Sequence, residues 1–260
     1  MPEGVEIEFY RRAAESAVGR TIESVDTPDA WFLKEGATPE AVTAACVGQV
    51  IVAARRRGKL LILDLDSGER LGLRFGMTGR LVVDGTAAIA YLEYTTKRSD
   101  PKWIRFGLVF NDGGYLVIND PRRLGGVILD PNEDGLGQDV FDVDPATFRS
   151  RVLVGDVAVK ARLLDQRRIA GVGNLICDET LWRAGIDPAR SAGSLSEDEG
   201  SKLFETLREV LADFLSDGGS HTGRLHSARV RGGRCPLDGE PLMRREIGGR
   251  TTYWCVRHQR

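Results

Sequence analysis

The pattern of apolar residues changes near residue 130, and this change limits how the chain can fold. From about residue 21 to residue 129, short apolar segments alternate with turn residues, and two hairpins are predicted with turns at 66–68 and 111–114. Several such strands in one region are typical of a β-sandwich or barrel. Residues 130–145 are rich in Asp, Pro and Gly, which indicates a linker.

Helical patterns lie on both sides of the strand region. The first is an amphipathic helix over residues 3–18, whose apolar face holds Val5, Phe9, Ala13 and Ala17. Beyond the linker we expect three helices, at 159–169, 174–185 and 196–219. The last opens with the Ser-x-x-Glu spacing of a capping box and ends at two glycines. Short strands return in the final forty residues, so the fold class is α+β.

Charge is distributed unevenly along the chain. The net charge is −2, but residues 221–260 hold nine arginines and three acidic residues, a local charge of +6. A basic module on an acidic body suits phosphate binding, and a solvated basic tail explains the charge equally well. No apolar run has the length of a membrane helix, and the acidic start is not a secretory signal. The four cysteines do not form a disulfide pattern, so we expect a reducing, cytoplasmic location.

The second residue of the chain carries a chemical signal. Methionine is normally removed before a small residue, and its removal leaves Pro2 with a free secondary amine. The pKa of an α-amino group lies far below that of lysine, so part of this amine is neutral at physiological pH. Such an amine can attack a sugar C1′ and form an iminium, and Glu3 can move the protons. Because Met-Pro starts are common, ordinary N-terminal processing explains this feature as well.

A glycine-rich turn precedes the helix predicted at 174–185. Gly171 and Gly173 permit a tight turn, and Asn174 is a suitable N-cap for the helix that follows. The backbone N–H groups of such a helix start can bind a phosphate. The spacing alone favours the alternative, a helix hairpin with a packing role.

The last forty residues contain a candidate metal site. Two pairs of potential ligands lie on either side of a short hairpin. The first pair is Cys235 and Asp238, the second is Cys255 and His258, and each pair has two intervening residues. Two thiols and an imidazole are good zinc ligands, and a carboxylate is an acceptable fourth. The alternative is a metal-free hairpin with two buried cysteines.

Three turn-like stretches complete the set. Lys59 ends a basic run at a strand start, where it can meet a phosphate. The turns at 76–79 and 120–125 present Met77, Arg122 and Leu124, side chains suited to wedging into a base stack. Either of these two turns taken singly is more typical of a sheet connection.

In their order along the chain, these motifs resemble the formamidopyrimidine-DNA glycosylase and endonuclease VIII family of bifunctional DNA glycosylase/AP lyases. The match runs through PEGVEIE, RRGKLLIL, GMTGRL, NDPRRLGG, IAGVGNLICDETLWRAGIDP and GGRTTYWCVRHQR. The resemblance implies a catalytic β-sandwich domain at 1–130, a helix–two-turns–helix domain at 145–219 and a zinc-finger-like hairpin at 220–260. It also implies double-stranded damaged DNA as the partner, a monomer, and a nucleoid-associated location.

The same resemblance implies roles for individual residues. The catalytic group forms the Schiff base, moves protons and holds the phosphate beside the lesion: Pro2, Glu3, Glu6 and Lys59. The DNA-binding group contacts flanking phosphates or fills the gap left by an extruded nucleotide: Arg74, Met77, Arg122, Leu124, Asn174 and Arg250. A structural Zn²⁺ is expected at the four hairpin ligands.

The chain also departs from the family pattern. Asp238 and His258 replace two of the usual four cysteines, Arg74 stands where a histidine is common, and Leu124 replaces a frequent aromatic residue. Residues 220–234 are shorter than the loop that covers oxidised guanine in part of the family. We therefore expect a preference for oxidised pyrimidines, hydantoins or ring-opened purines. The alternatives are a damage-binding protein with little or no excision activity, and a structural zinc protein without a DNA role.

Overall fold

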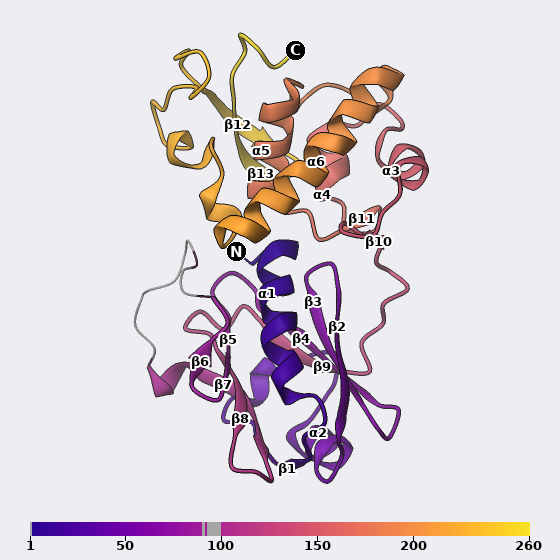
Figure 1. The fold of residues 1–260 in the computed structure, drawn as a ribbon, viewed down its shortest axis with the longest axis vertical. Coiled ribbons are helices and arrows are strands. Elements are labelled where there is room, and N and C mark those ends of the chain that lie inside the picture. The colour runs from indigo at the N-terminus through magenta and orange to yellow at the C-terminus, as the bar shows by residue number, and fades with distance from the viewer. Residues whose placement is uncertain (1, 90–91, 93–99) are drawn as a thin grey trace. The chain divides into compact units, whose positions relative to one another are not determined.

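A computed structural model describes residues 2–89, 92 and 100–260 of the chain (Figure 1). Met1, which we expect to be removed, lies outside the described residues. Contacts divide the chain into two compact units, one formed by Pro2 and Glu6–Glu133, the other by Glu3–Val5 and Asp134–Arg260. Among the described residues, no helix is both long and apolar enough to cross a membrane.

The first helix is shorter than predicted. Helix α1 covers Gly4–Ala14, and Glu15–Ala17 continue as a tighter 3-10 turn before Gly19 turns the chain at a φ of +85°. Val5 and Ala17 of the predicted apolar face are fully buried, but between them the buried side chains are Ile7, Tyr10 and Ala14 rather than Phe9 and Ala13. Those two side chains are half-buried against the same core.

Two antiparallel sheets make up most of the first unit. The four-stranded sheet has the order β2 (Ile51–Arg57), β3 (Leu60–Leu65), β4 (Arg70–Arg74) and β9 (Gly126–Leu129). The five-stranded sheet has the order β1 (Ile22–Asp26), β7 (Ile104–Phe110), β8 (Tyr115–Asn119), β5 (Arg80–Val83) and β6 (Thr86–Ala87). Both predicted hairpins are confirmed, as β3–β4 and β7–β8.

One apolar core joins the two sheets and α1. Leu63 and Leu71 from one sheet and Phe106 and Leu116 from the other belong to the same cluster of buried side chains as Tyr10. Alternating strand residues supply this core, because successive side chains of a strand point to opposite faces. The predicted β-sandwich is therefore confirmed.

A short helix within the strand region was not predicted. Helix α2 (Pro39–Cys46) is only eight residues long, and the hydroxyl of Thr38 caps its N-terminus by accepting from the Ala41 N–H. The segment between β1 and α2 also contains a 3-10 turn, η2 (Ala30–Phe32).

The second unit is mainly helical. Its helices are α3 (Pro145–Val152), α4 (Val159–Leu164), α5 (Asn174–Ala184) and α6 (Glu197–Asp217), with a small parallel pair of strands, β10 (Gln138–Asp139) and β11 (Ile169–Ala170). Helix α6 has the predicted capping box, and left-handed glycines end α5 and α6. Helix α4 stops at Leu164, five residues earlier than predicted, because Asp165 begins a turn that accepts the Arg167 and Arg168 N–H groups.

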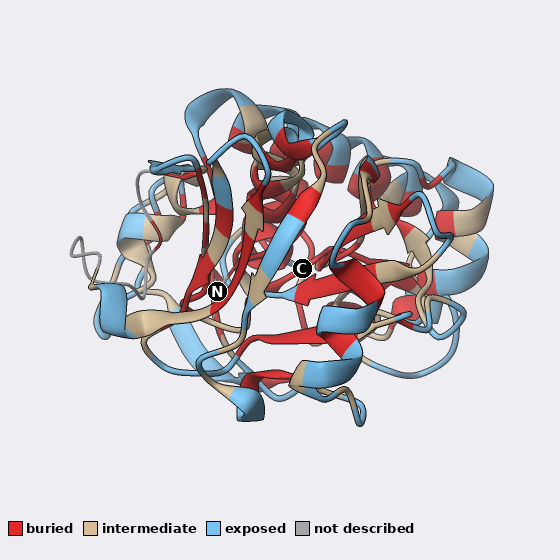
Figure 2. Ribbon diagram, turned by 90° about the horizontal axis from the view of Figure 1, so that it is seen from below, coloured by how far each residue is buried: buried red, intermediate tan, exposed pale blue. Residues whose placement is uncertain are grey.

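The chain ends in a hairpin, as predicted. Strands β12 (Met243–Ile247) and β13 (Arg250–Trp254) pair in an antiparallel ladder whose two-residue turn is Gly248–Gly249. Helix α5 packs against both α6 and β13, and nine of its eleven residues are buried. Figure 2 shows buried residues in red along the helices and strands of the chain. The hairpin is therefore anchored on the most buried helix of its unit.

Candidate functional site

The carboxylate of Glu3 lies at the N-terminus of α5. Glu3 is 1% exposed, and its two oxygens accept the backbone N–H groups of Leu175 at 2.9 Å and Ile176 at 3.0 Å. Free N–H groups and the helix dipole favour an anion at this position. The prediction that Asn174 caps the helix is therefore wrong: the N-cap residue is Gly173, and Glu3 supplies the oxygen atoms.

Close approach explains the glycines before α5. Gly173 has an extended backbone that any residue can adopt, but a Cβ there would lie 2.1 Å from Cδ of Glu3. Gly171 has a φ of +115°, and its carbonyl accepts the Gly4 N–H at 2.8 Å. The turn at 171–173 thus contacts Glu3 and Gly4. The backbone N–H groups of Leu175 and Ile176 donate to the Glu3 carboxylate.

The start of β13 lies beside the start of α5. The side-chain amide of Asn174 donates from Nδ2 to the carbonyl oxygen of Thr251 at 3.0 Å. Arg250, the preceding residue, is exposed at the hairpin turn, where Gly248 and Gly249 both have positive φ. Three predicted site residues, Glu3, Asn174 and Arg250, therefore gather within the second unit.

The remaining predicted catalytic residues belong to the first unit. Pro2 is buried and covalently joined to Glu3, and Glu6 is 3% exposed in the first turn of α1. Burial, together with the negative charge of Glu6, raises the pKa of Tyr10 well above its ordinary value. Lys59 is half-buried in the two-residue turn between β2 and β3, at the edge of the four-stranded sheet's first hairpin.

A buried aspartate joins the two turns that carry the predicted wedge residues. The carboxylate of Asp120 is fully buried and accepts the Thr78 hydroxyl at 2.6 Å, the Gly125 N–H at 2.8 Å and the Arg122 N–H at 3.2 Å. Asp120 was not among the predicted site residues. An Asp-Pro pair within a turn is the local signal that could have identified it.

The two turns also pack directly on each other. Gly76 has a φ of +56°, and a Cβ there would lie 2.3 Å from the backbone carbon of Leu124. Met77 is half-buried in one turn, whereas Arg122 and Leu124 are exposed in the other. The structure therefore brings these three predicted residues to neighbouring turns of the first unit.

Arg74 ends β4 and forms a surface ion pair. Its guanidinium lies 3.4 Å from a carboxylate oxygen of Glu35, and both side chains are about half exposed. Exposed pairs of this kind contribute little free energy, on the order of 0–1 kcal/mol. An incoming anion can therefore compete with Glu35 for Arg74.

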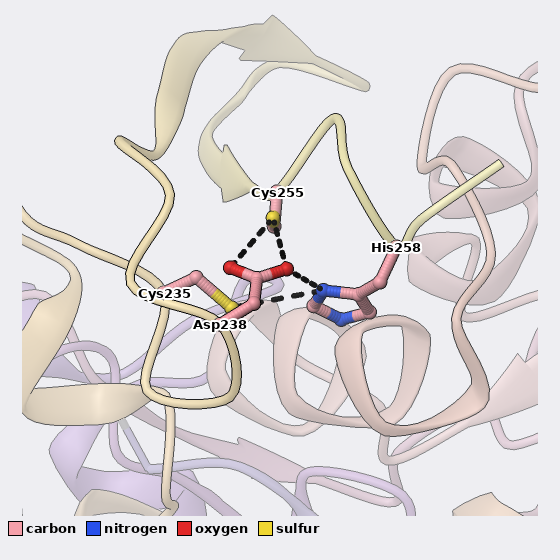
Figure 3. Close-up of side chains that lie close together, drawn as sticks. All are labelled: Cys235, Asp238, Cys255 and His258. Atoms are coloured by element: carbon pink, nitrogen blue, oxygen red, sulfur yellow. Dashed lines mark hydrogen bonds and ion pairs between the residues drawn. The ribbon is translucent and has the colours of Figure 1, made fainter.

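The four predicted metal ligands come together in the second unit (Figure 3). One potential ligand atom from each of Cys235, Asp238, Cys255 and His258 lies within 4.8 Å of the others. Three of these separations are 3.3 Å for Cys255 Sγ to Asp238 Oδ2, 3.4 Å for His258 Nδ1 to Asp238 Oδ2, and 3.6 Å for Cys235 Sγ to His258 Nδ1. These separations suit the edges of a tetrahedron with bonds of about 2.0–2.3 Å. The donor set therefore fits a zinc ion.

Residues around this cluster orient the ligands. His258 Nε2 lies 3.1 Å from the Trp182 carbonyl, which can only accept, so Nε2 donates to it and Nδ1 faces the other ligand atoms. The indole N–H of Trp182 donates to Cys235 Sγ at 3.4 Å. Hydrogen bonds, the largest of them from the Glu240 N–H, lower the pKa of Asp238 to about 2. The carboxylate is thus ionised, and the imidazole ring is oriented with Nδ1 towards the other ligand atoms.

Two neighbouring acidic residues of α5 fix the segment that follows α6. Glu179 is 3% exposed and accepts the backbone N–H groups of Arg224 at 3.0 Å and Leu225 at 2.9 Å. Asp178 is 2% exposed and accepts Arg229 Nη2 at 2.9 Å and Lys160 Nζ at 2.5 Å. These contacts were not predicted, because nothing local in the sequence marks two buried acids.

Comparisons with known proteins agree over both units. The formamidopyrimidine-DNA glycosylase N-terminal domain model matches residues 1–127, and the formamidopyrimidine-DNA glycosylase H2TH domain model matches residues 136–224. A formamidopyrimidine-DNA glycosylase of Carboxydothermus hydrogenoformans is 32% identical over 276 residues, with 100% of both chains covered.

Solved structures show the same fold. The MutM (Fpg) protein of Thermus thermophilus is 31% identical, with a TM-score of 0.79 and coverage of 99% of this chain and 98% of that one. The Lactococcus lactis Fpg (MutM), solved with a DNA that contains N7-benzyl-Fapy-dG, is 25% identical, with a TM-score of 0.80 and 99% of each chain covered. Because the family models span most of the sequence and relatives align over its full length, the chain belongs to the formamidopyrimidine-DNA glycosylase family of DNA-repair enzymes.

Proposed function

We propose that this chain excises a damaged base from duplex DNA and cleaves the resulting abasic strand by β/δ-elimination, with the amine of Pro2 as nucleophile. The observation that carries the proposal is the position of Glu3. A buried carboxylate, held by two helix N–H groups, is covalently attached to the residue whose amine would attack. Membership of a glycosylase family, with a relative solved on lesion-containing DNA, supports damaged DNA as the substrate.

The proposed chemistry uses the two residues in sequence. The lone pair of the Pro2 nitrogen attacks C1′ and the bond from C1′ to the base breaks; the departing base takes up a proton from water, and the proton of the attacking amine passes to the Glu3 carboxylate. Glu3 then gives this proton to the sugar ring oxygen as the ring opens, which yields an iminium on Pro2. The iminium acidifies the C2′ protons, and loss of one expels the 3′ phosphate. Glu6 supports these proton transfers.

Other residues hold the DNA in this proposal. Lys59, Arg74, Asn174 and Arg250 contact phosphates around the extruded nucleotide. Met77, Arg122 and Leu124 fill the gap that it leaves. The hydrogen bonds of Asp120 support this assignment, because they join the turns that carry the gap-filling residues.

Zinc is proposed as the structural ion of the C-terminal hairpin. Cys235, Asp238, Cys255 and His258 would hold it, and its chemistry would be that of a cross-link rather than of a catalyst. The cross-link would join the segment before β12 to the segment after β13 and so hold the two ends of the hairpin that carries Arg250. The short separations between the four ligand atoms support this proposal.

The preferred lesions are proposed to be oxidised pyrimidines, hydantoins or ring-opened purines. The segment after α6 is short, and Glu179 and Asp178 fix it at two points. A segment held in this way is unsuited to fold over a flipped 8-oxoguanine as a mobile cover. The panel of lesions that the enzyme accepts tests this part separately from the chemistry.

The central test is borohydride trapping on a duplex that contains one abasic site. Borohydride reduces an iminium to a stable amine, so wild-type protein should form a covalent adduct and the Pro2→Gly variant should not. Glu3→Gln should bind the same duplex but lose base excision. Absence of an adduct from wild-type protein that binds the DNA would refute the proposal and favour a damage-binding protein without excision activity.

A further inference from the structure

A tryptophan lies exposed beside the turn that carries Arg122 and Leu124. Trp31 is 59% exposed, the second most exposed of the large apolar side chains described. Its neighbours Phe32 and Leu33 are buried in the core of the first unit. A large aromatic side chain at the surface, directly attached to buried residues, is a frequent sign of a contact surface.

The backbone that presents Trp31 is rigidly held. The Lys34 N–H donates to the Val127 carbonyl at 2.8 Å, so this segment lies along β9. Gly125 and Gly126 permit this contact, since a Cβ at Gly125 would lie 2.9 Å from the Phe32 ring and one at Gly126 would lie 2.5 Å from Lys34 Cγ. The exposure of Trp31 is therefore a property of an ordered segment.

Cations surround the indole ring. Lys34 Nζ lies 3.2 Å from the ring centroid, and the guanidinium of Arg123 lies 5.1 Å from it. The side chain of Lys34 is also held at this position, because its Nζ donates to the Trp31 carbonyl at 2.7 Å. We call Trp31, Lys34 and Arg123 the tryptophan–cation cluster.

One acidic residue connects this cluster to the neighbouring turn. Asp29 accepts two hydrogen bonds from Arg123, at 2.6 and 2.7 Å, and lies 3.8 Å from Arg105. Arg105 in turn donates to the backbone carbonyl of Asp120 at 2.9 Å. Trp31 is thus linked to the turn at 120–125 through Arg123, Asp29 and Arg105. Three cations, Lys34, Arg123 and Arg105, outnumber the single carboxylate of Asp29.

We infer that the tryptophan–cation cluster is a further DNA-binding subsite, in which Trp31 stacks on a base left unpaired where the duplex is opened and Lys34 contacts an adjacent phosphate. This inference rests on the proposed function, because the neighbouring turn is what would open the duplex. Aromatic faces bind bases of any sequence, and basic side chains beside them bind the backbone. In the free protein Lys34 covers the ring, and a phosphate draws this flexible side chain aside when DNA binds.

Equilibrium binding of variants tests the subsite. Trp31→Ala should weaken binding to a duplex with a stable abasic-site analogue by about 5- to 150-fold, the range for loss of one base–aromatic stack. Binding to the undamaged duplex should change much less, since its bases stay paired. Trp31→Phe should restore most of the affinity. Tyr115→Ala is the matched control, because Tyr115 is also an exposed aromatic residue but starts β8, at the opposite end from the 120–125 turn.

The salt dependence of binding tests the cation. Lys34→Ala should lower the slope of log K against log salt by about 0.9, the value for one phosphate contact, on damaged and undamaged DNA alike. Trp31→Ala should leave the slope unchanged. Lys202→Ala, an exposed lysine on α6, is the control.

Fluorescence gives a direct signal of stacking. Part of the protein's tryptophan fluorescence should be quenched when the abasic duplex binds, and Trp31→Phe should lack that part. Equal affinities for wild type and Trp31→Ala, or an equal loss on both duplexes, would overturn the inference while excision remained intact. Failure of the wild-type protein to bind or excise would instead refute the proposed function itself.

Discussion

The Gly173→Ala substitution tests the position of Glu3, because the three atoms nearest to the added methyl group all belong to Glu3. The backbone at Gly173 is extended, with φ of −118°, so alanine fits the chain without strain. Its methyl group would lie 2.1 Å from Glu3 Cδ, whereas ordinary contact begins at 3.4 Å, so the carboxylate must move by at least 1.3 Å. Misplacement of a catalytic group by about 1 Å costs on the order of 100-fold in rate.

Single-turnover excision of a damaged base measures this effect directly. We expect Gly173→Ala to lose about 100-fold in the excision rate and about 2 kcal/mol of stability, because α5 loses its capping oxygens. Binding to abasic DNA should persist. Gly135→Ala is the matched control, since a Cβ at that glycine meets nothing within 4 Å. A Gly173→Ala variant that excises at the wild-type rate would refute the assignment of Glu3.

Three further predictions concern stability. Hydrogen bonds from Arg190 and Ser196 lower the pKa of Glu199 from 4.5 to about 2, so its stabilising effect is complete above pH 4.5 and is lost as the pH falls towards 2. The melting temperature of wild type should therefore fall more steeply over that range than that of Glu199→Gln, and parallel curves would contradict this. Lys160→Met leaves Asp178 with one cation fewer in a buried site, and we expect a loss of about 3 kcal/mol in the free energy of urea unfolding. Lys202→Met, at an exposed position, should lose almost none, and an equal loss in both variants would count against a role for the buried pair. Elemental analysis should find one zinc per chain, which Cys255→Ser or a chelator should remove with a lower melting temperature. A wild-type protein free of zinc would contradict the metal proposal alone.

Local patterns were sufficient to predict most of the fold. The hairpins β3–β4 and β7–β8 have their turn residues between alternating strands, so each is specified within about twenty residues. Helix α6 has its capping box and its terminal glycines in its own sequence. The four hairpin ligands were predicted because their spacing repeats, and the structure brings them together.

Contacts between distant residues could not be predicted in this way. Glu3 caps α5 from the other end of the sequence, so the local pattern assigned the cap to Asn174 instead. Asp120 joins two turns that lie about forty residues apart. Trp31 is marked only by its exposure, which depends on how Phe32 and Leu33 pack. Each of these contacts exists only once the tertiary structure has formed.

The long reach of Glu3 has a consequence for the order of assembly. Its two hydrogen-bond partners are 172 and 173 residues further along the chain. Glu3 is made before the β-sandwich, but the amides that hold it are made only after the whole of it. Closing so long a loop is slow, because chain entropy must be lost before the contact forms. The carboxylate that we propose as the proton donor is therefore fixed late in synthesis, and under the proposed function a nascent chain that has folded only its first unit does not yet cut DNA.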